Sequence, residues 1–259
     1  MLDPISRMNE ALAKAVVYRT LSMAFQTPTR DRLCDMGALD GFTVFIEALR
    51  CIEGRDGTDT LAVAVQAVPA VRVRDLDRLA GEYWRIFGHT TRGLVCACET
   101  EFGDGNKFQQ PQELADIAGY YLAFGLTPPS AAETRLDHVA CECEFLEFLN
   151  RKQARLIAMD LEGEGDQETL DATAQAERTF LRDHLGRFGR AFGAALAGAG
   201  VGRYHGAFGS IFLLFLDVAC ARAGVEAGPL GLIVRPDLVD DTPMMCGSAE
   251  DLIQIQRHP

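Results

Sequence analysis

The feature that most constrains the fold is a long stretch in which apolar residues recur at helical spacing. Between residues 131 and 159 they form one stripe: Leu136, Val139, Ala140, Cys143, Leu146 and Leu149. No comparable run alternates between apolar and polar residues, as a half-exposed strand would. Segments with a helical period bury their apolar faces by packing as helices, so we predict an all-α helical bundle.

Several other segments have the same period and end at Gly- or Pro-containing turns. We predict helices over residues 4–25, 37–50, 75–87, 112–124, 131–159, 167–196 and 203–223, and an ambiguous apolar run at 61–68. We expect one domain over residues 1–259, with a hinge near 125–136 between two helical halves and a poorly ordered tail from about residue 225. Residues 88–110 are predicted to be a long irregular segment, a type of loop that is often functional.

Charge and hydropathy limit the partners that the chain can have. The net charge of −12 disfavours nucleic acid and anionic membrane surfaces and favours a cationic partner, although such a charge also simply keeps a protein in solution. The N-terminus has no basic segment followed by an apolar core, and the most apolar stretch, 211–216, is too short to span a bilayer. We therefore expect a cytoplasmic protein without stable membrane insertion.

Common catalytic motifs are missing from the sequence. It has no Gly-x-Gly-x-x-Gly, no phosphate-binding loop, no Gly-x-Ser-x-Gly and no His-Glu-x-x-His, and its five histidines are scattered along the chain. Nothing in the sequence indicates a reaction class. We predict that the chain is not an enzyme and has no cofactor of its own.

Two Cys-x-Cys pairs suggest an alternative function. Cys96 and Cys98, together with Cys141 and Cys143, would supply four thiolates for tetrahedral zinc, or the first pair could be redox-active. However, only one residue separates the members of each pair, and neighbours two apart on a helix point to different faces. Buried, unreactive thiols are the simpler interpretation.

Polar residues at the start of the predicted helix 131–159 have two interpretations. Asp137 and His138 can cap and pack the helix end, or they can anchor a basic residue of a bound peptide. Glu142 lies one turn after His138 on the same face. Glu99 and Glu101 could form a carboxylate pair, but a solvated loop is the simpler interpretation.

Five segments occur in one order along residues 10–190. They are YRTLSMAF (18–25), EYWRIFG (82–88), ETEFG (99–103), LADIAGYYLAFGL (114–126) and DHVACECEFL (137–146). Together they resemble the TorD/DmsD/NarJ family, the dedicated chaperones of molybdenum oxidoreductases. The third segment is similar to the branch that serves ethylbenzene and dimethylsulfide dehydrogenase-type enzymes. The chain departs from the family pattern at Leu136, where a proline is usual, and in Cys141 and Cys143, which are not typical.

The resemblance implies an all-helical chaperone without catalytic turnover. Such proteins bind the twin-arginine signal peptide or N-terminal region of a catalytic subunit. They hold it in the cytoplasm until the bis-molybdopterin guanine dinucleotide cofactor is inserted. The chaperone would be a monomer or a domain-swapped homodimer. A metal-binding or redox-active protein using the two cysteine pairs remains the alternative, as does a permanent accessory subunit.

The resemblance also assigns a peptide-binding site. Its apolar part would be Tyr83, Ile86 and Phe87, which are otherwise expected in a hydrophobic core. Its polar part would contain Asp137 and His138, with Glu142 nearby and Arg19 as a basic position of the first helix.

Overall fold

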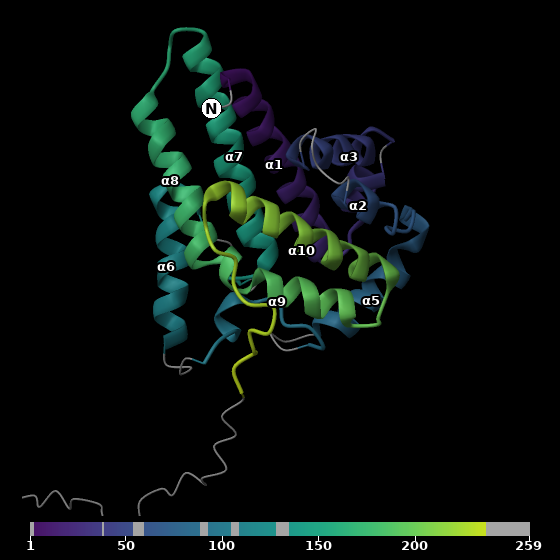
Figure 1. Cartoon of the computed structure of the whole chain (residues 1–259). Helices are drawn as coiled ribbons and strands as arrows, with labels where there is room; N and C mark the ends of the chain where they lie inside the picture. Colours follow the sequence, from purple (N-terminus) through teal and green to yellow (C-terminus); the bar gives the residue numbers. More distant parts are fainter. Residues whose placement is uncertain are drawn as a thin grey trace, which may run out of the picture.

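The structure, a computed structural model, describes residues 3–37, 39–53, 60–88, 93–104, 109–127 and 135–236. These residues form ten α-helices and two 3-10 helices and contain no strand, which confirms the all-α prediction (Figure 1). The α-helices are α1 (Pro4–Phe25), α2 (Arg30–Gly37), α3 (Leu39–Glu53), α4 (Thr60–Val65), α5 (Leu76–Phe87), α6 (Gln110–Ala123), α7 (Val139–Leu161), α8 (Gln167–Asp183), α9 (Leu185–Gly198) and α10 (Arg203–Ala223). The 3-10 helices are η1 (Val73–Asp75) and η2 (Glu99–Glu101).

Helix α7 packs against α1 and against α8, and the three helices form one layer of the bundle (Figure 1). Helix α1 begins at Pro4 because Asp3 caps it, with the Ser6 N–H donating to the Asp3 carboxylate at 3.1 Å. A buried ion pair joins the three helices: Lys14 Nζ of α1 lies 2.8 Å from Glu177 of α8. Asn150 of α7 also donates to Glu177, at 3.1 Å.

Helices α9 and α10 lie side by side across this layer (Figure 1). Their close approach depends on glycine. A Cβ atom at Gly209 would lie 2.8 Å from the backbone nitrogen of Ala197 and 3.0 Å from the carbonyl oxygen of Gly193. A larger residue at position 209 would therefore push the two backbones apart.

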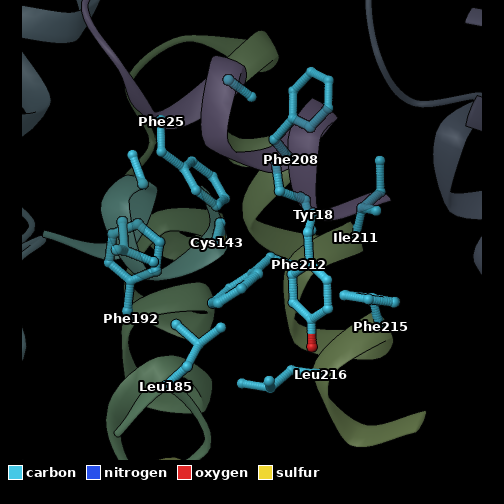
Figure 2. Close-up of a cluster of buried hydrophobic side chains, with 14 of the residues drawn as sticks. Tyr18, Phe25, Cys143, Leu185, Phe192, Phe208, Ile211, Phe212, Phe215 and Leu216 are labelled. Atoms are coloured by element: carbon cyan, nitrogen blue, oxygen red, sulfur yellow. The ribbon is translucent and has the colours of Figure 1, made fainter. Parts of the chain in front are cut away.

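A core of aromatic side chains fills the space between α1, α7, α9 and α10. Phe25 contacts Phe192 and Phe212 edge to face, with ring centroids 5.2 and 5.3 Å apart. Figure 2 shows Cys143 of α7 and Tyr18 of α1 among these rings. The buried side chains from α1 to α10 form one contiguous cluster.

The predicted helices 4–25 and 203–223 have the observed bounds, but three other predictions were wrong in detail. Helix α2 was missed because it is short and mostly polar. Helix α7 begins at Val139 rather than at 131, because His138 is extended and caps it. The single helix predicted over 167–196 is two helices, separated at His184 by backbone angles of φ −121° and ψ −102°. Residues 128–134 of the predicted hinge lie outside the described residues.

Helix α10 is the one helix of the described ranges with the length and hydropathy that a membrane span requires. Half of its most apolar stretch is buried inside the protein. A core helix passes the same test of length and composition, and the packing of Phe208, Phe212 and Phe215 is that of a core helix.

The α9–α10 contact gives a testable prediction. Replacing Gly209 with Ala is expected to lower the free energy of unfolding by about 1–3 kcal/mol, because the methyl group meets backbone atoms that cannot move separately. Urea denaturation followed by circular dichroism measures the change. The matched control is Gly119→Ala in α6, where nothing lies within 4 Å. It should stabilise the protein by about 0.5–1 kcal/mol, and equal effects of the two substitutions would refute the packing argument.

Candidate functional site

The irregular segment that contains Glu99 and Glu101 lies inside the protein. It pairs with the chain before α7: the Glu99 N–H donates to the Asp137 carbonyl at 2.9 Å, and the Val139 N–H donates to the Ala97 carbonyl at 2.8 Å. Only 2% of Glu99 and 5% of Glu101 is exposed. The expectation of a solvated loop was therefore wrong, and the two carboxylates belong to a buried polar centre.

The carboxylate of Asp137 accepts four hydrogen bonds in this centre. It is fully buried and accepts hydrogen bonds from the backbone N–H and the hydroxyl of Thr100, at 3.1 and 2.8 Å. The Arg135 guanidinium donates to both Asp137 oxygens at 2.9 and 2.8 Å and to Glu101 at 3.0 Å. The Asp137 carboxylate, which was predicted to anchor a bound peptide, is thus already paired with Arg135 of the same chain.

Glu99 organises the other half of the centre. Its carboxylate lies 3.1 Å from Nδ1 of His184, at the α8–α9 break, and accepts from Arg187 Nη2 of α9 at 2.9 Å. Glu142 is fully buried near Glu99, and burial together with that negative charge raises its pKa well above the ordinary value. Burial and the nearby charge of Glu99 therefore disfavour the anionic form of Glu142, which is the form that would pair with an arginine.

His138 caps α7. Its Nδ1 accepts a hydrogen bond from the Ala140 N–H at 3.1 Å. Burial lowers the pKa of His138 to about 4, so the imidazole is neutral and free to accept. The capping function considered for the Asp137–His138 pair thus lies with the histidine.

The chain after α10 returns to the polar centre, past α9 (Figure 1). We call residues 231–236 the strap. The Gly103 N–H donates to the Ile233 carbonyl at 2.9 Å, and the Arg235 N–H donates to the Glu101 carbonyl at 2.7 Å. These bonds flank an antiparallel bridge between Phe102 and Val234. Residues 225–236 therefore contact the rest of the chain at the place where a poorly ordered tail was expected to begin, and residues 237–259 lie outside the described part.

The three apolar residues of the predicted peptide site lie in the core. Ile86 is fully buried, and Tyr83 and Phe87 are nearly so. The Phe87 ring stacks on Phe192 at 6.4 Å between centroids. They do not line a groove in this structure, and their role in peptide binding stays a prediction.

Arg19 is the exposed member of the predicted set, and it lines a pocket between α1, α2 and α3. We call this the α1–α3 pocket; its volume is about 470 Å³. Its lining is mostly apolar, and an ion pair of 3.9 Å between Arg19 and Asp35 lies at its edge. The lining side chains include Val16, Met23, Phe42, Val44 and Phe45.

The cysteines do not converge on a metal. Cys143 is fully buried in the aromatic core, whereas Cys141 is partly exposed on another face of α7. Burial raises the pKa of Cys96 to about 11 and that of Cys141 to about 12, so both thiols stay protonated. Within the described ranges, no three His, Cys, Asp or Glu residues form a group that could hold a metal ion.

A second buried polar pair lies between α5 and α10. Nδ1 of the fully buried His205 lies 3.9 Å from Glu82, which also accepts from Arg78 at 2.8 Å. Burial lowers the pKa of His205 from 6.5 to about 4, more than the Glu82 charge raises it.

This pair predicts acid sensitivity. Between pH 6.5 and 4 the unfolded chain holds a proton on His205 that the folded chain does not, so stability is lost as pH falls through this range. Between pH 7 and pH 5 the loss should be about 2 kcal/mol. Urea denaturation at pH 7 and pH 5 measures the loss of unfolding free energy between the two pH values. In His205→Phe this loss should be smaller than in the unaltered chain by about 2 kcal/mol. An unchanged difference would show that His205 does not titrate in this way.

The site residues that sequence reasoning missed are Arg135, His184, Arg187, Arg235 and Glu113. They come from distant segments, and no spacing connects them. The one available signal was the pair Glu99 and Glu101, since buried carboxylates require partners.

The described residues thus form an all-α bundle with an apolar pocket at its surface and a buried polar centre, in which Arg135, Arg187 and Arg235 each contact a carboxylate. The family model described as nitrate reductase delta subunit matches residues 55–194, more than half of the chain. The chain therefore belongs to this family, the NarJ/TorD-type chaperones of molybdoenzyme maturation, which bind catalytic subunits and are not themselves catalytic enzymes. No curated protein and no solved structure gave a significant match.

Proposed function

We propose that this chain is a cytoplasmic maturation chaperone that binds the N-terminal region of a molybdenum oxidoreductase catalytic subunit, including its twin-arginine signal peptide. It holds this precursor until the bis-molybdopterin guanine dinucleotide cofactor has been inserted. The observation that carries the proposal is the family match over residues 55–194, which contains most of the buried polar centre. The chaperone has no cofactor of its own and acts as a monomer or a domain-swapped dimer.

The α1–α3 pocket supports this proposal as the docking place for the apolar stretch of the signal peptide. Its open volume of about 470 Å³ and its aliphatic and aromatic lining suit apolar side chains. The net charge of −12 attracts the basic residues that accompany such a stretch. The pocket lies outside the matched residues, so its role rests on geometry alone.

The buried candidates have a different role in this proposal. Tyr83, Ile86 and Phe87 hold α5 against the core, and Asp137 and His138 fix the start of α7. Replacing any of these buried residues would change client binding indirectly, because it would disturb the packing that supports the surface of the chaperone.

The test is capture of the client from native cytoplasm by the full-length chaperone, with mass spectrometry of the proteins that co-purify. The expected result is an unprocessed molybdenum-enzyme catalytic subunit in 1:1 ratio. We expect this subunit to be of the ethylbenzene or dimethylsulfide dehydrogenase type. Enrichment must be lost when the signal peptide of that subunit is deleted. Enrichment that survives the deletion would refute the signal-peptide part and leave the family function in place.

A further inference from the structure

The strap places a single buried arginine in an acidic site. Only 4% of Arg235 is exposed, and its Nη2 donates to Glu113 of α6 at 2.7 Å. Its backbone N–H donates to the Glu101 carbonyl. Glu101 in turn holds Arg135, so this end of the polar centre binds arginine twice.

The fit between Arg235 and its site is incomplete. Among the described residues, Nε and Nη1 of Arg235 have no hydrogen-bond partner, although both atoms are buried. The second oxygen of Glu113 is also buried without a partner. A carboxylate with a free oxygen can bind a guanidinium through two parallel hydrogen bonds, which is the stronger arrangement. Glu113 could thus accept two hydrogen bonds from one guanidinium, but it accepts only one from Arg235.

The rest of the strap is held weakly. Ile233 is 57% exposed and Val234 is 38% exposed, so the strap buries little apolar surface. Two backbone hydrogen bonds around the Phe102–Val234 bridge hold it beside residues 101–103. Segments with few buried apolar contacts open at low free-energy cost.

We propose that the strap is an intramolecular placeholder, which occupies the site for an arginine-bearing, extended segment of the client and is displaced when that segment binds. The client segment would add its backbone beside residues 101–103, as the strap does, and direct its arginine at Glu113. This inference rests on the proposed function, because the competing segment is the signal peptide of the client. The client segment can bind only while the strap is out of the site. Its apparent dissociation constant is therefore the intrinsic constant divided by the fraction of chaperone molecules whose site is open.

The test uses the full-length chain and a fluorescent synthetic peptide with an arginine pair followed by an apolar stretch. Arg235→Ala should bind this peptide about tenfold more tightly than the unaltered chain, which corresponds to a strap that fills the site about nine-tenths of the time. Arg235→Gln, which keeps a hydrogen-bond donor and preserves folding better, should show a smaller gain in the same direction. Thermal unfolding confirms that each variant is folded.

Two controls separate displacement from other effects. Loss of any positive charge strengthens attraction of a cationic peptide, so the matched variant is Arg7→Ala, at the exposed start of α1. It should show only this small general gain, and the gain of Arg235→Ala should clearly exceed it. Adding Glu113→Gln to Arg235→Ala should abolish the gain, because the carboxylate charge that pairs with a guanidinium is lost. A gain that persists in this double variant overturns the proposal.

The remaining outcomes are also decisive. If the unaltered chain binds the peptide and Arg235→Ala binds it equally well, the strap is no competitor, and the proposed function stands without it. If neither chain binds the peptide, recognition of an arginine-bearing signal peptide fails, and the placeholder role fails with it.

Discussion

Replacing Asp137 with Ala is expected to lower the free energy of unfolding by about 3 kcal/mol. The substitution removes a buried acceptor that pairs with Nε and Nη2 of Arg135 and with two donors of Thr100. Breaking a buried ion pair by removing one partner costs about 3–5 kcal/mol, because the other charge is left without compensation. The lower value applies here because Arg135 keeps Glu101 as a partner.

Urea denaturation of the purified variant measures this change. The matched control is Asp183→Ala, which also removes an arginine-paired carboxylate, that of the Arg182 pair, but at an exposed position. It should cost less than about 1 kcal/mol. If the two variants lose the same stability, the buried centre does not hold the chain before α7 in place, and Asp137 is left available for a client arginine.

The fold was largely predictable because most helices have a clear apolar stripe. The start of α1 followed from Asp3-Pro4, a cap followed by proline at the first helical position. The bounds of α10 followed from the glycines at 202 and 224, which flank the helix. The break at His184 was not predictable, since the apolar period continues from 167 to 196 without a proline, and the glycines of this stretch lie inside α9 rather than at the break. What interrupts it is a tertiary contact, the pairing of His184 with Glu99.

The site was only partly predictable, for a related reason. Sequence patterns identified Glu99, Glu101, Asp137, His138 and Glu142 as notable residues but not their partners. The arginines pair with carboxylates that are far away in the sequence, so no motif spacing reveals the pairs. Arg235 and Glu113, for example, are 122 residues apart. Charged residues in irregular segments are usually solvated, so the sequence alone favoured exposure, and the pairing with residues 135–139 overturned it.

The α1–α3 pocket carries the second large prediction. Replacing Val44 with Lys should weaken binding of the client's signal peptide by about 10- to 30-fold, because an ammonium group then stands where an apolar side chain would dock. Val44 is 44% exposed on α3, so the substitution leaves folding nearly unchanged. Fluorescence anisotropy with a labelled peptide of the captured client gives the dissociation constants.

Val63 of α4 supplies a matched control for Val44→Lys. It is the same residue type in another helix, 57% exposed and not part of the pocket lining. Val63→Lys adds the same charge, so it reports the general repulsion between a less acidic chaperone and a cationic peptide. A loss confined to Val44→Lys places the apolar stretch in the pocket. Equal losses in both variants would mean that net charge, rather than the pocket, controls binding, and the apolar stretch would then have to dock on another surface.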